Sequence, residues 1–496
     1  METFFSINPL IALLAPVLAA ILIVFSSRWP NIREFWTILG SITMCGVIFS
    51  MLPDVLNGRY PEISLVAISP GISLALRVDT AGIIFGISAS VLWILTSFFS
   101  IGYMRSLSMH KQTRYYASFA LCLASTVGVA FAANLLTFVL FYEILTIATY
   151  PLVIHNETPK AISAGHKYLA YLLTGGLFLI AATALTYLYS GTLNFNSGGF
   201  LSNLSGQPNL IFLFVLFLVG FGVKSALMPF HGWLPTAMVA PSPVSGLLHA
   251  VAVVKSGVFG FIRVVGFVFG PELFHDIGAW QILAIMAAIT ILISSLLALR
   301  QDNIKRRLAY STIGHLSYIL LGISLLSTSA WIGGLLHLVN HAALKITLFL
   351  CTGALYAKAH CENVSEIDGM SKQMPITMAA FTLTSIGLVG IPPINGFISQ
   401  WFLGKGTLEA DLGIYLGLLL LSGLLNAAYF FPIIRRAYFI KSEKRTKFAE
   451  ASMFMVIPLV LTAALSLFLG LVPDGVFHFY QLASDTVANI FNGVMR

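Results

Sequence analysis

The sequence predicts an all-α integral membrane protein with about fourteen transmembrane helices. Of its 496 residues, 58% are apolar and only 9% are charged, and the mean hydropathy is +0.90. Because soluble domains carry about 25% charged residues, a water-exposed globule of this length would lack enough polar groups to cover itself. A soluble enzyme is therefore excluded, and so is a disordered chain, which needs low hydrophobicity and high charge.

The N-terminus is predicted to be a retained first helix. An apolar run starts at Ile7, and the only charge before it is Glu2. A secretory signal would need a basic start and a small-residue cleavage site. The formal net charge of +8 does not indicate nucleic-acid binding, because the basic residues lie in short gaps between apolar runs and not on one face.

The four cysteines, Cys45, Cys122, Cys351 and Cys361, form no CxxC pair, and the first three lie in apolar runs, where sulfur behaves as a small hydrophobe. We therefore expect no disulfide framework, metal site or iron–sulfur cluster. The chain also has no cofactor motif or nucleotide-binding loop, so we expect no bond chemistry from this chain alone.

Windows of about 20 apolar residues are long enough to cross ~30 Å of hydrocarbon as helices. A break at Asn134 separates the fourth window from the fifth. The predicted spans are 7–26, 35–52, 80–104, 115–133, 135–154, 166–189, 210–228, 244–266, 278–299, 308–326, 331–356, 376–400, 410–434 and 452–472.

The distribution of Lys and Arg supports this count. Nineteen of them fall in the odd-numbered gaps between spans, against four in the even-numbered gaps and the two tails. By the positive-inside rule, the odd gaps face the cytoplasm and both termini face outward.

Five ionisable residues remain inside the spans. A charge at mid-membrane costs at least ~2.5 kcal/mol, so each is a functional hypothesis. Arg263 lies near a helix end, where it could snorkel or anchor the helix. The other four need partners or water, and they are Glu143, Lys224, Lys255 and Lys345.

Glu143, near the centre of the fifth span, is expected to pair with Lys224, which is equally deep in the seventh. The alternative is a static ion pair that only orients two helices. A static pair would be a poor use of two buried charges, because buried pairs contribute weakly to stability.

Histidines give the second signal. The eleventh span places His337, His341 and Lys345 at i, i+4 and i+8, on one face of a helix. His315 lies in the tenth span, and His249 lies with Lys255 in the eighth. A lone helical histidine is usually a satisfied core residue, but a row of titratable groups indicates a proton pathway, because imidazole titrates near neutral pH. A metal site is the weaker alternative, since the stripe holds no cysteine or carboxylate.

Two spans carry Gly/Pro breaks at comparable positions, MPFHGWLP at 228–235 and GIPPINGF at 390–397. Irregular backbone at membrane depth is tolerated where it is buried in protein or lines a cavity. Ordinary proline kinks are the alternative. Breaks five spans apart predict two inverted five-helix repeats, spans four to eight and nine to thirteen. The predicted units are 1–114, 115–266, 278–435 and 436–496.

With these residues identified, the chain resembles the antiporter-like proton-translocating membrane subunits of respiratory complex I, membrane-bound hydrogenases and multi-subunit cation/proton antiporters. It is most similar to the D-type component of the antiporters or to a hydrogenase component built on that pattern. The matching stretches are FYEILTIATYPLV, GFGVKSALMPFHGWLPTAMVAPSPVSGLLHAVAVVKSG, RRLAYSTIGHLSYILLG, VNHAALKITLFL and GIPPINGFISQW.

The resemblance implies a role for each site residue. Glu143 and Lys224 would form the essential pair of the first half-channel, with Lys255 as the connecting lysine. His249, His315 and His341 would belong to a central hydrophilic axis that His337 and Lys345 would extend. The family usually ends this axis with Lys or Glu, where this chain has Gln400. Glutamine cannot take up a proton at physiological pH, so either Lys405, about one turn further on, would substitute for it, or the subunit would couple by conformation alone.

We therefore expect a proton-translocating subunit in the inner membrane of a prokaryote. Its partners would be other membrane subunits, further antiporter-like subunits and a redox arm or an ion-exchange module, with H⁺ and in an antiporter Na⁺ as the transported ions. A scaffold subunit with a pathway blocked at Gln400 is the second hypothesis. A solute carrier is the third, although the polar groups lie in a row over several helices and do not converge on one pocket.

Overall fold

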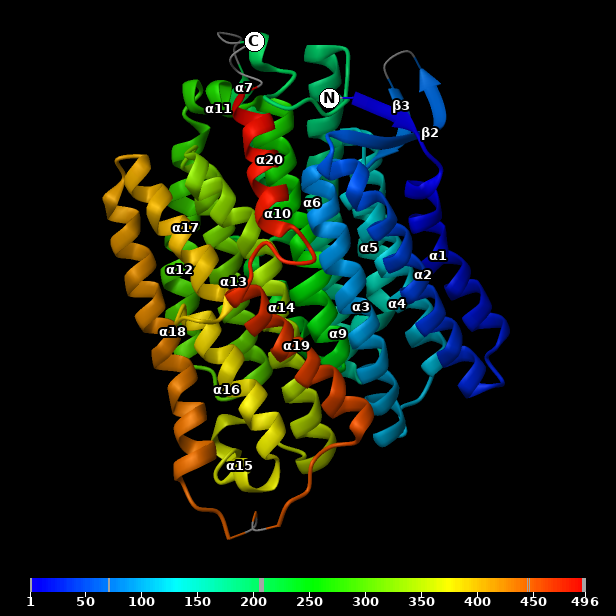
Figure 1. Cartoon of the computed structure of the whole chain (residues 1–496), viewed down its shortest axis with the longest axis vertical. Helices are drawn as coiled ribbons and strands as arrows, with labels where there is room; N and C mark the ends of the chain where they lie inside the picture. The colour runs from blue at the N-terminus through cyan, green and yellow to red at the C-terminus, as the bar shows by residue number, and fades with distance from the viewer. Residues whose placement is uncertain (1, 70–71, 205–208, 444, 446, 493–496) are drawn as a thin grey trace.

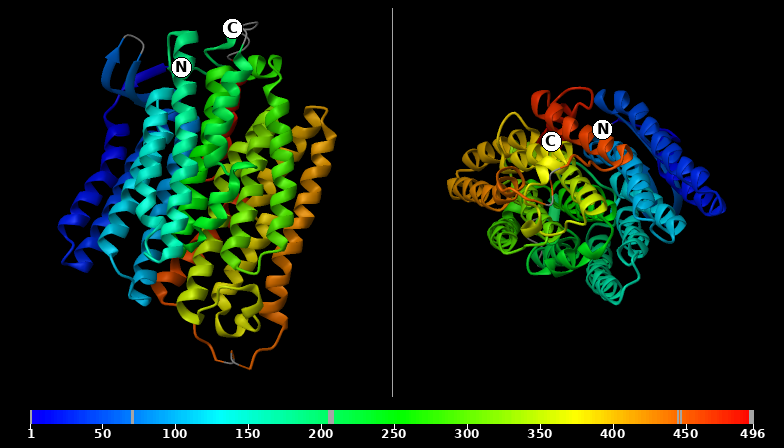
Figure 2. Two further views of the ribbon diagram at one scale, coloured as in Figure 1. Left: turned by 180° about the vertical axis from the view of Figure 1, so that it is seen from behind. Right: turned by 90° about the horizontal axis from the view of Figure 1, so that it is seen from below.

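A computed structural model describes residues 2–69, 72–204, 209–443, 445 and 447–492, with backbone but not side chains at 203, 248, 249 and 492. Long helices run side by side in one bundle, with α1 and α2 on one flank and α18 on the other (Figure 1). Both termini lie at one end of the bundle and α15 lies at the other. A view along the bundle keeps the first two helices at its periphery (Figure 2).

Helices make up most of the described chain. Their bounds are α1 Asn8–Phe25, α2 Pro30–Leu56, α3 Thr80–Ser106, α4 Gln112–Ala130, α5 Leu135–Val153, α6 Pro159–Ser190, α7 Leu210–Lys224, α8 Trp233–Thr236, α9 Ser242–Gly246, α10 Val253–Arg263, α11 Pro271–Asp276, α12 Ala279–Leu299, α13 Ile304–Ser324, α14 Thr328–Ala359, α15 Met370–Gln373, α16 Pro375–Val389, α17 Asn395–Glu409, α18 Gly413–Phe439, α19 Met453–Leu471 and α20 Phe479–Asn492.

Among the described residues, nine helices are long and apolar enough to cross a membrane: α1, α2, α3, α5, α6, α12, α14, α18 and α19. Two shorter apolar helices, α7 and α16, lead into the predicted breaks. Each of the fourteen predicted spans falls on helix. The spans that do not correspond to one of these nine helices are shorter, interrupted or more polar. The number fourteen stays a prediction.

The all-α fold class is incomplete, because a small sheet covers the end of the bundle that carries the termini. Two of its strands lie in the outer loop at 53–79, where the sequence allows short strands. Its strands are β1 Glu2–Phe5, β2 Arg59–Ser69 and β3 Ile72–Arg77, in the order β1-β2-β3. β1 pairs parallel with β2, and β2 pairs antiparallel with β3. The partner of β1 is more than fifty residues away along the chain, so local periodicity gives no sign of this pairing.

Both predicted helix breaks are present. α7 ends at Lys224, and short helical turns follow before α9 starts. The second break separates α16 from α17 over residues 390–394. The eighth span is also uneven, because two π-helical segments, Leu247–Val251 and Val264–Phe269, flank α10.

The two halves of the chain share a set of local features. The Asn134 side chain caps α5, and the Asn303 side chain caps α13. α6 and α14 each have 32 residues and are capped by Thr158 and Ser327. Each of these two cap pairs is separated by 169 residues, from 134 to 303 and from 158 to 327. An isolated antiparallel bridge follows in each half, joining Asn134 to Asn194 and Asn303 to Asn363.

Candidate functional site

Helix α14 forms the core of the candidate site. All of its most apolar 18-residue window is buried, and it packs against α13, α16, α17 and α19. The helix begins at a serine cap and contains no proline, so its stripe of polar residues keeps helical register. A polar stripe on a wholly buried helix must find its partners inside the protein.

Three imidazoles form a cluster between α13 and α14, which contribute one and two of them respectively. The His315 ring centroid lies 5.3 Å from that of His337 and 5.4 Å from that of His341. All three side chains are at most 1% exposed. His315 Nδ1 lies 3.2 Å from His337 Nε2, and His337 Nδ1 lies 2.8 Å from Ser399 Oγ. Within the described part of the chain, neither ring nitrogen of His341 has a hydrogen-bond partner. The predicted row is therefore a three-dimensional cluster contributed by α13 and α14.

Lys345 extends this cluster by one turn of α14. Its Nζ donates to Ser311 Oγ at 2.7 Å and to the Leu308 carbonyl at 3.3 Å. The Tyr429 hydroxyl lies 2.7 Å from Ser311 Oγ and also donates to Asn426 Oδ1. Hydroxyl and amide groups on α13 and α18 thus join the lysine to the surroundings of the imidazoles.

Lys255 on α10 is 1% exposed, and its Nζ has no hydrogen-bond partner among the side chains that the structure describes. It is close enough to His341 and Lys345 to interact with them electrostatically. Gly257, two residues further along, lets α10 approach the break of α7, because a Cβ there would lie 2.5 Å from Ser225 N. The glycine places α10 directly against the end of α7.

Lys224 is the last residue of α7, and its Nζ donates to the Tyr142 carbonyl at 2.6 Å and lies 3.3 Å from the Tyr142 ring centroid. Glu143, the next residue on α5, interacts with Lys224 electrostatically, but its Oε1 has no hydrogen-bond partner among the described residues, and Lys224 Nζ binds the Tyr142 carbonyl instead. The expected ion pair is therefore absent as a direct contact in this conformation. The helix places neighbouring side chains about 100° apart, so Glu143 points toward α6, where its carboxylate packs against Gly176.

Arg263 neither snorkels nor reaches lipid. Its guanidinium binds the Asp79 carboxylate with two hydrogen bonds and the Ala130 carbonyl with a third. Three phenylalanine rings, of Phe195, Phe259 and Phe267, lie within 5.3 Å of the guanidinium carbon. Of the two roles expected for Arg263, snorkelling is wrong and anchoring is supported, because Asp79, which caps α3 just outside the predicted span, supplies a buried counter-charge.

Gln400 and Lys405 lie in α17, beyond the second break. Gln400 Nε2 donates to the Leu388 carbonyl at 3.1 Å. Lys405 is more than half exposed and pairs with Glu409 at 3.5 Å. Both side chains line a mostly apolar groove of about 500 Å³ between α17 and α18. The groove therefore links the two residues that the sequence offers for the end of the axis.

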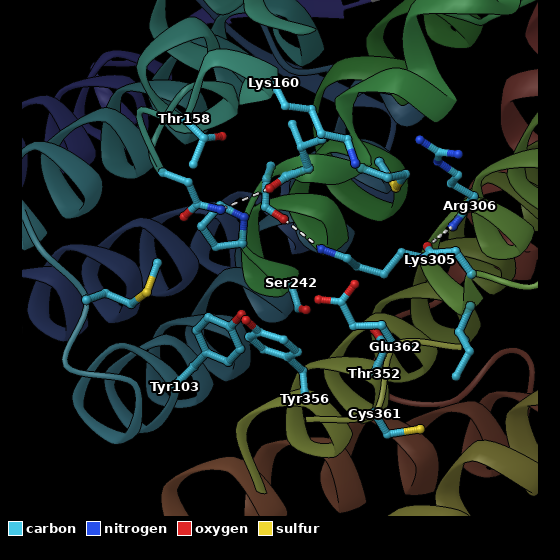
Figure 3. Close-up of a pocket in the computed structure, with 18 of the residues that line it drawn as sticks. Tyr103, Thr158, Lys160, Ser242, Lys305, Arg306, Thr352, Tyr356, Cys361 and Glu362 are labelled. Atoms are coloured by element: carbon cyan, nitrogen blue, oxygen red, sulfur yellow. Dashed lines mark hydrogen bonds between the residues drawn. The ribbon is translucent and has the colours of Figure 1, made fainter. Parts of the chain in front are cut away.

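A second cavity, of about 600 Å³, opens among the ends of α3, α9, α13 and α14 (Figure 3). Its polar lining includes Tyr103, Lys160, Ser242, Lys305 and Glu362. Lys305 Nζ reaches across it to the Ala240 carbonyl at 2.9 Å. We call this cavity the vestibule. It lies at the end of α14 that leads to α15.

His249 was a predicted member of the axis, and its side chain lies outside the described residues. The structure adds four polar residues that the sequence analysis did not single out: Ser311, Ser399, Asn426 and Tyr429. Serine and tyrosine are common in membrane helices, so only Asn426, a buried amide in an apolar run, gives a sequence signal. Among the described residues, no group of three or more His, Cys, Asp or Glu side chains could hold a metal ion.

The comparison with known families decides the class of the protein. Residues 132–426 match the family described as NADH:quinone oxidoreductase/Mrp antiporter, TM. The chain belongs to this family of antiporter-like membrane subunits. The matched residues span both helix breaks and the whole imidazole cluster, so the family assignment covers the candidate site. It also makes the chain a multi-pass integral membrane protein.

Relatives come from several kinds of complex. The chain is 33% identical over 360 residues to NADH-quinone oxidoreductase subunit N of Desulforudis audaxviator, covering 71% of each chain. It is 33% identical over 345 residues to hydrogenase-4 component B of Escherichia coli, covering 66% of this chain and 50% of that protein. The Mrp complex from Dietzia sp. has the same fold in one chain, with a TM-score of 0.87, 18% identity, and coverage of 98% of this chain and 97% of that one.

Proposed function

We propose that this chain translocates protons across the membrane as one subunit of a larger complex, through two half-channels joined by a central axis. The buried cluster of His315, His337 and His341 carries the proposal. Three imidazoles with ring centroids 5.3 to 5.8 Å apart would be a costly way to fill a membrane core. His341, whose two ring nitrogens have no partner among the described residues, can accept a proton and pass it on.

The vestibule would supply water to the axis from the end of the bundle that carries α15. Thr352 in its wall lies seven residues beyond Lys345 on α14, a rise of ~10 Å. Protons would move from the vestibule to Lys345 and His341, and then through the other imidazoles toward Ser399. Lys224 and Lys255 would control this transfer through charge, with Lys224 responding to the approach of the Glu143 carboxylate.

The architecture proposed from the sequence gains support from the shared local features of the two halves. The caps at 134 and 303, the caps at 158 and 327 and the two Asn–Asn bridges recur at a constant interval. α6 ends at the end of the bundle that holds the termini, and α14 ends at the α15 end (Figure 1). Two inverted repeats over spans four to eight and nine to thirteen account for this arrangement.

The outer half-channel would use the groove that contains Gln400 and Lys405. Since glutamine does not titrate, Lys405 with Glu409 would release the proton at this end. The alternative, a scaffold or relay subunit blocked at Gln400, is favoured by one observation: the Gln400 amide is bound to a main-chain carbonyl and lies in place of a titratable group.

Glu143 also bears on the partners. It is only partly buried, and Leu140, Ile144 and Ile147 beside it on α5 are 40% to 63% exposed. A carboxylate beside an open apolar face needs cover, which a neighbouring membrane subunit would supply. We propose that the complex lies in the inner membrane of a prokaryote with both termini outward, and that an ion-exchange or redox module drives it.

The test replaces Glu143 or Lys224 by alanine in the purified complex, reconstituted in vesicles, and follows quenching of a pH-sensitive dye. Pumping should be lost while assembly is retained. His275→Gln, at an exposed histidine of α11 outside the axis, should pump normally. Normal pumping by fully assembled Glu143 and Lys224 variants would refute the proposal.

A further inference from the structure

Asn426 on α18 lies at the junction of several polar groups, and its amide orientation is fixed by them. Its Nδ2 lies 3.3 Å from the Leu388 carbonyl. A main-chain carbonyl only accepts hydrogen bonds, so the amide nitrogen, and not the amide oxygen, must face it. The opposite end, Oδ1, then receives the hydrogen of the Tyr429 hydroxyl. The Leu388 carbonyl therefore selects the orientation, and the Tyr429 hydroxyl, which can donate or accept, is compatible with it.

This orientation determines the protonation of His315. The Asn426 Nδ2 also lies 3.4 Å from His315 Nε2, with the Tyr318 hydroxyl at 3.5 Å as its third neighbour. An amide NH₂ only donates, and its two hydrogens face three neighbours. A protonated Nε2 of His315 would point its hydrogen at a group that cannot accept it, which favours the unprotonated, accepting Nε2. In a neutral ring the proton then sits on Nδ1, which faces His337 Nε2 at 3.2 Å.

The far end of the chain of hydrogen bonds is compatible with this assignment. Ser399 Oγ lies 3.1 Å from the Gly396 carbonyl and can donate its only hydrogen to it. In that arrangement Ser399 Oγ accepts from His337 Nδ1 at 2.8 Å, which places the His337 proton on Nδ1 and leaves its Nε2 free to accept from His315. One hydrogen-bond direction, from α18 to α17, therefore satisfies both rings.

We infer that Asn426 is a positioning residue that holds His315 and His337 as neutral Nδ1–H tautomers, with every donor directed from α18 toward Ser399. An amide cannot relay a proton by hopping, so Asn426 also separates the imidazoles from the Tyr429 and Ser311 hydroxyls. Within the proposed function, this polarity directs a proton from His337 toward Ser399, beside Gln400. The tautomer assignment itself does not depend on transport.

The test is solid-state ¹⁵N NMR of the intact complex with labelled histidine in this subunit, the two signals being identified by their loss in His315→Gln and His337→Gln. In the wild type, both rings should show a protonated Nδ1 and an unprotonated Nε2. In Asn426→Leu, His315 should lose this pattern and populate the Nε2–H form. Thr183→Ala, which removes a buried hydroxyl on α6 that bonds the Leu179 carbonyl of its own helix, should leave both rings unchanged.

The wild-type spectrum alone can overturn the inference, so it does not depend on the variant folding. An Nε2–H or charged His315 in the wild type, or an unchanged His315 in Asn426→Leu, refutes it. Dye quenching on the same samples separates the two proposals. If both rings are Nδ1–H tautomers but the complex does not pump, the proposed function is refuted and the tautomer inference is supported. If the complex pumps but the rings are Nε2–H tautomers, the inference is refuted and the proposed function is supported.

Discussion

Gln400 and Asn426 donate hydrogen bonds to the same main-chain oxygen, the Leu388 carbonyl, at 3.1 and 3.3 Å. Gln400 lies where the sequence predicts the end of the axis, and Asn426 contacts the His315 imidazole. The proposed end of the axis is therefore joined to its proposed centre through a single peptide group in the last turn of α16. A substitution at Gln400 that shifts the Leu388 carbonyl would therefore change the hydrogen bonds of Asn426 and His315 without a large rearrangement.

The first prediction concerns how protons leave the axis. Gln400→Lys should leave pumping unaltered in reconstituted vesicles, because Lys405 with Glu409 already supplies a titratable group in the groove. Lys405→Ala should then abolish most pumping. Increased pumping in Gln400→Lys would instead support the scaffold alternative, in which Gln400 blocks the pathway.

The second prediction concerns the contact between Glu143 and α6. A Cβ at Gly176 would lie 2.5 Å from Glu143 Oε1, so Gly176→Ala should push the carboxylate out of place. Since displacement of a reacting group by about 1 Å can cost ~100-fold in rate, we expect pumping to fall on the order of tenfold or more. Gly46→Ala is the matched control, because a Cβ there meets nothing within 4 Å. Equal pumping by the two variants would show that the carboxylate position is unimportant.

The third prediction concerns stability. Arg263→Met leaves the Asp79 carboxylate buried without its partner, which should cost about 3–5 kcal/mol and lower the melting temperature of the complex clearly. Arg59→Met removes an exposed pair with Asp54, whose N–O distance is 3.6 Å, and should cost at most about 1 kcal/mol. Similar decreases in melting temperature for Arg263→Met and Arg59→Met would contradict the claim that the buried Arg263–Asp79 pair stabilises the fold.

The fourth prediction concerns pH. Burial, and next to it Arg114, lowers the pKa of His155, in the loop after α5, to about 4. The unfolded chain takes up this proton near pH 6.5 and the folded chain only near pH 4. Stability should therefore fall as the pH drops through this window, by at most ~1.4 kcal/mol per pH unit. Thermal melts of His155→Gln should lack this part of the pH dependence, whereas His275→Gln should keep it.

Much of the site follows from the sequence because the membrane makes polar residues conspicuous. The α14 stripe of His337, His341 and Lys345 follows from helical spacing alone, and the two breaks follow from their Gly/Pro content. The partners do not follow, because they depend on tertiary contacts. Lys224 binds the Tyr142 carbonyl and ring, and Arg263 binds Asp79 from a helix almost two hundred residues away. The strand β1 escapes prediction for the same reason.

The Leu388 carbonyl belongs to the peptide backbone, so no side-chain replacement at position 388 can delete it. A screen of random substitutions would register only the donors that converge on this oxygen and would pass over the acceptor they share. An inherited variant at Leu388 can alter the size of the side chain but always keeps the oxygen. The proposed connection between the axis and its outer end thus depends on a main-chain atom, which a point mutation can displace but cannot remove.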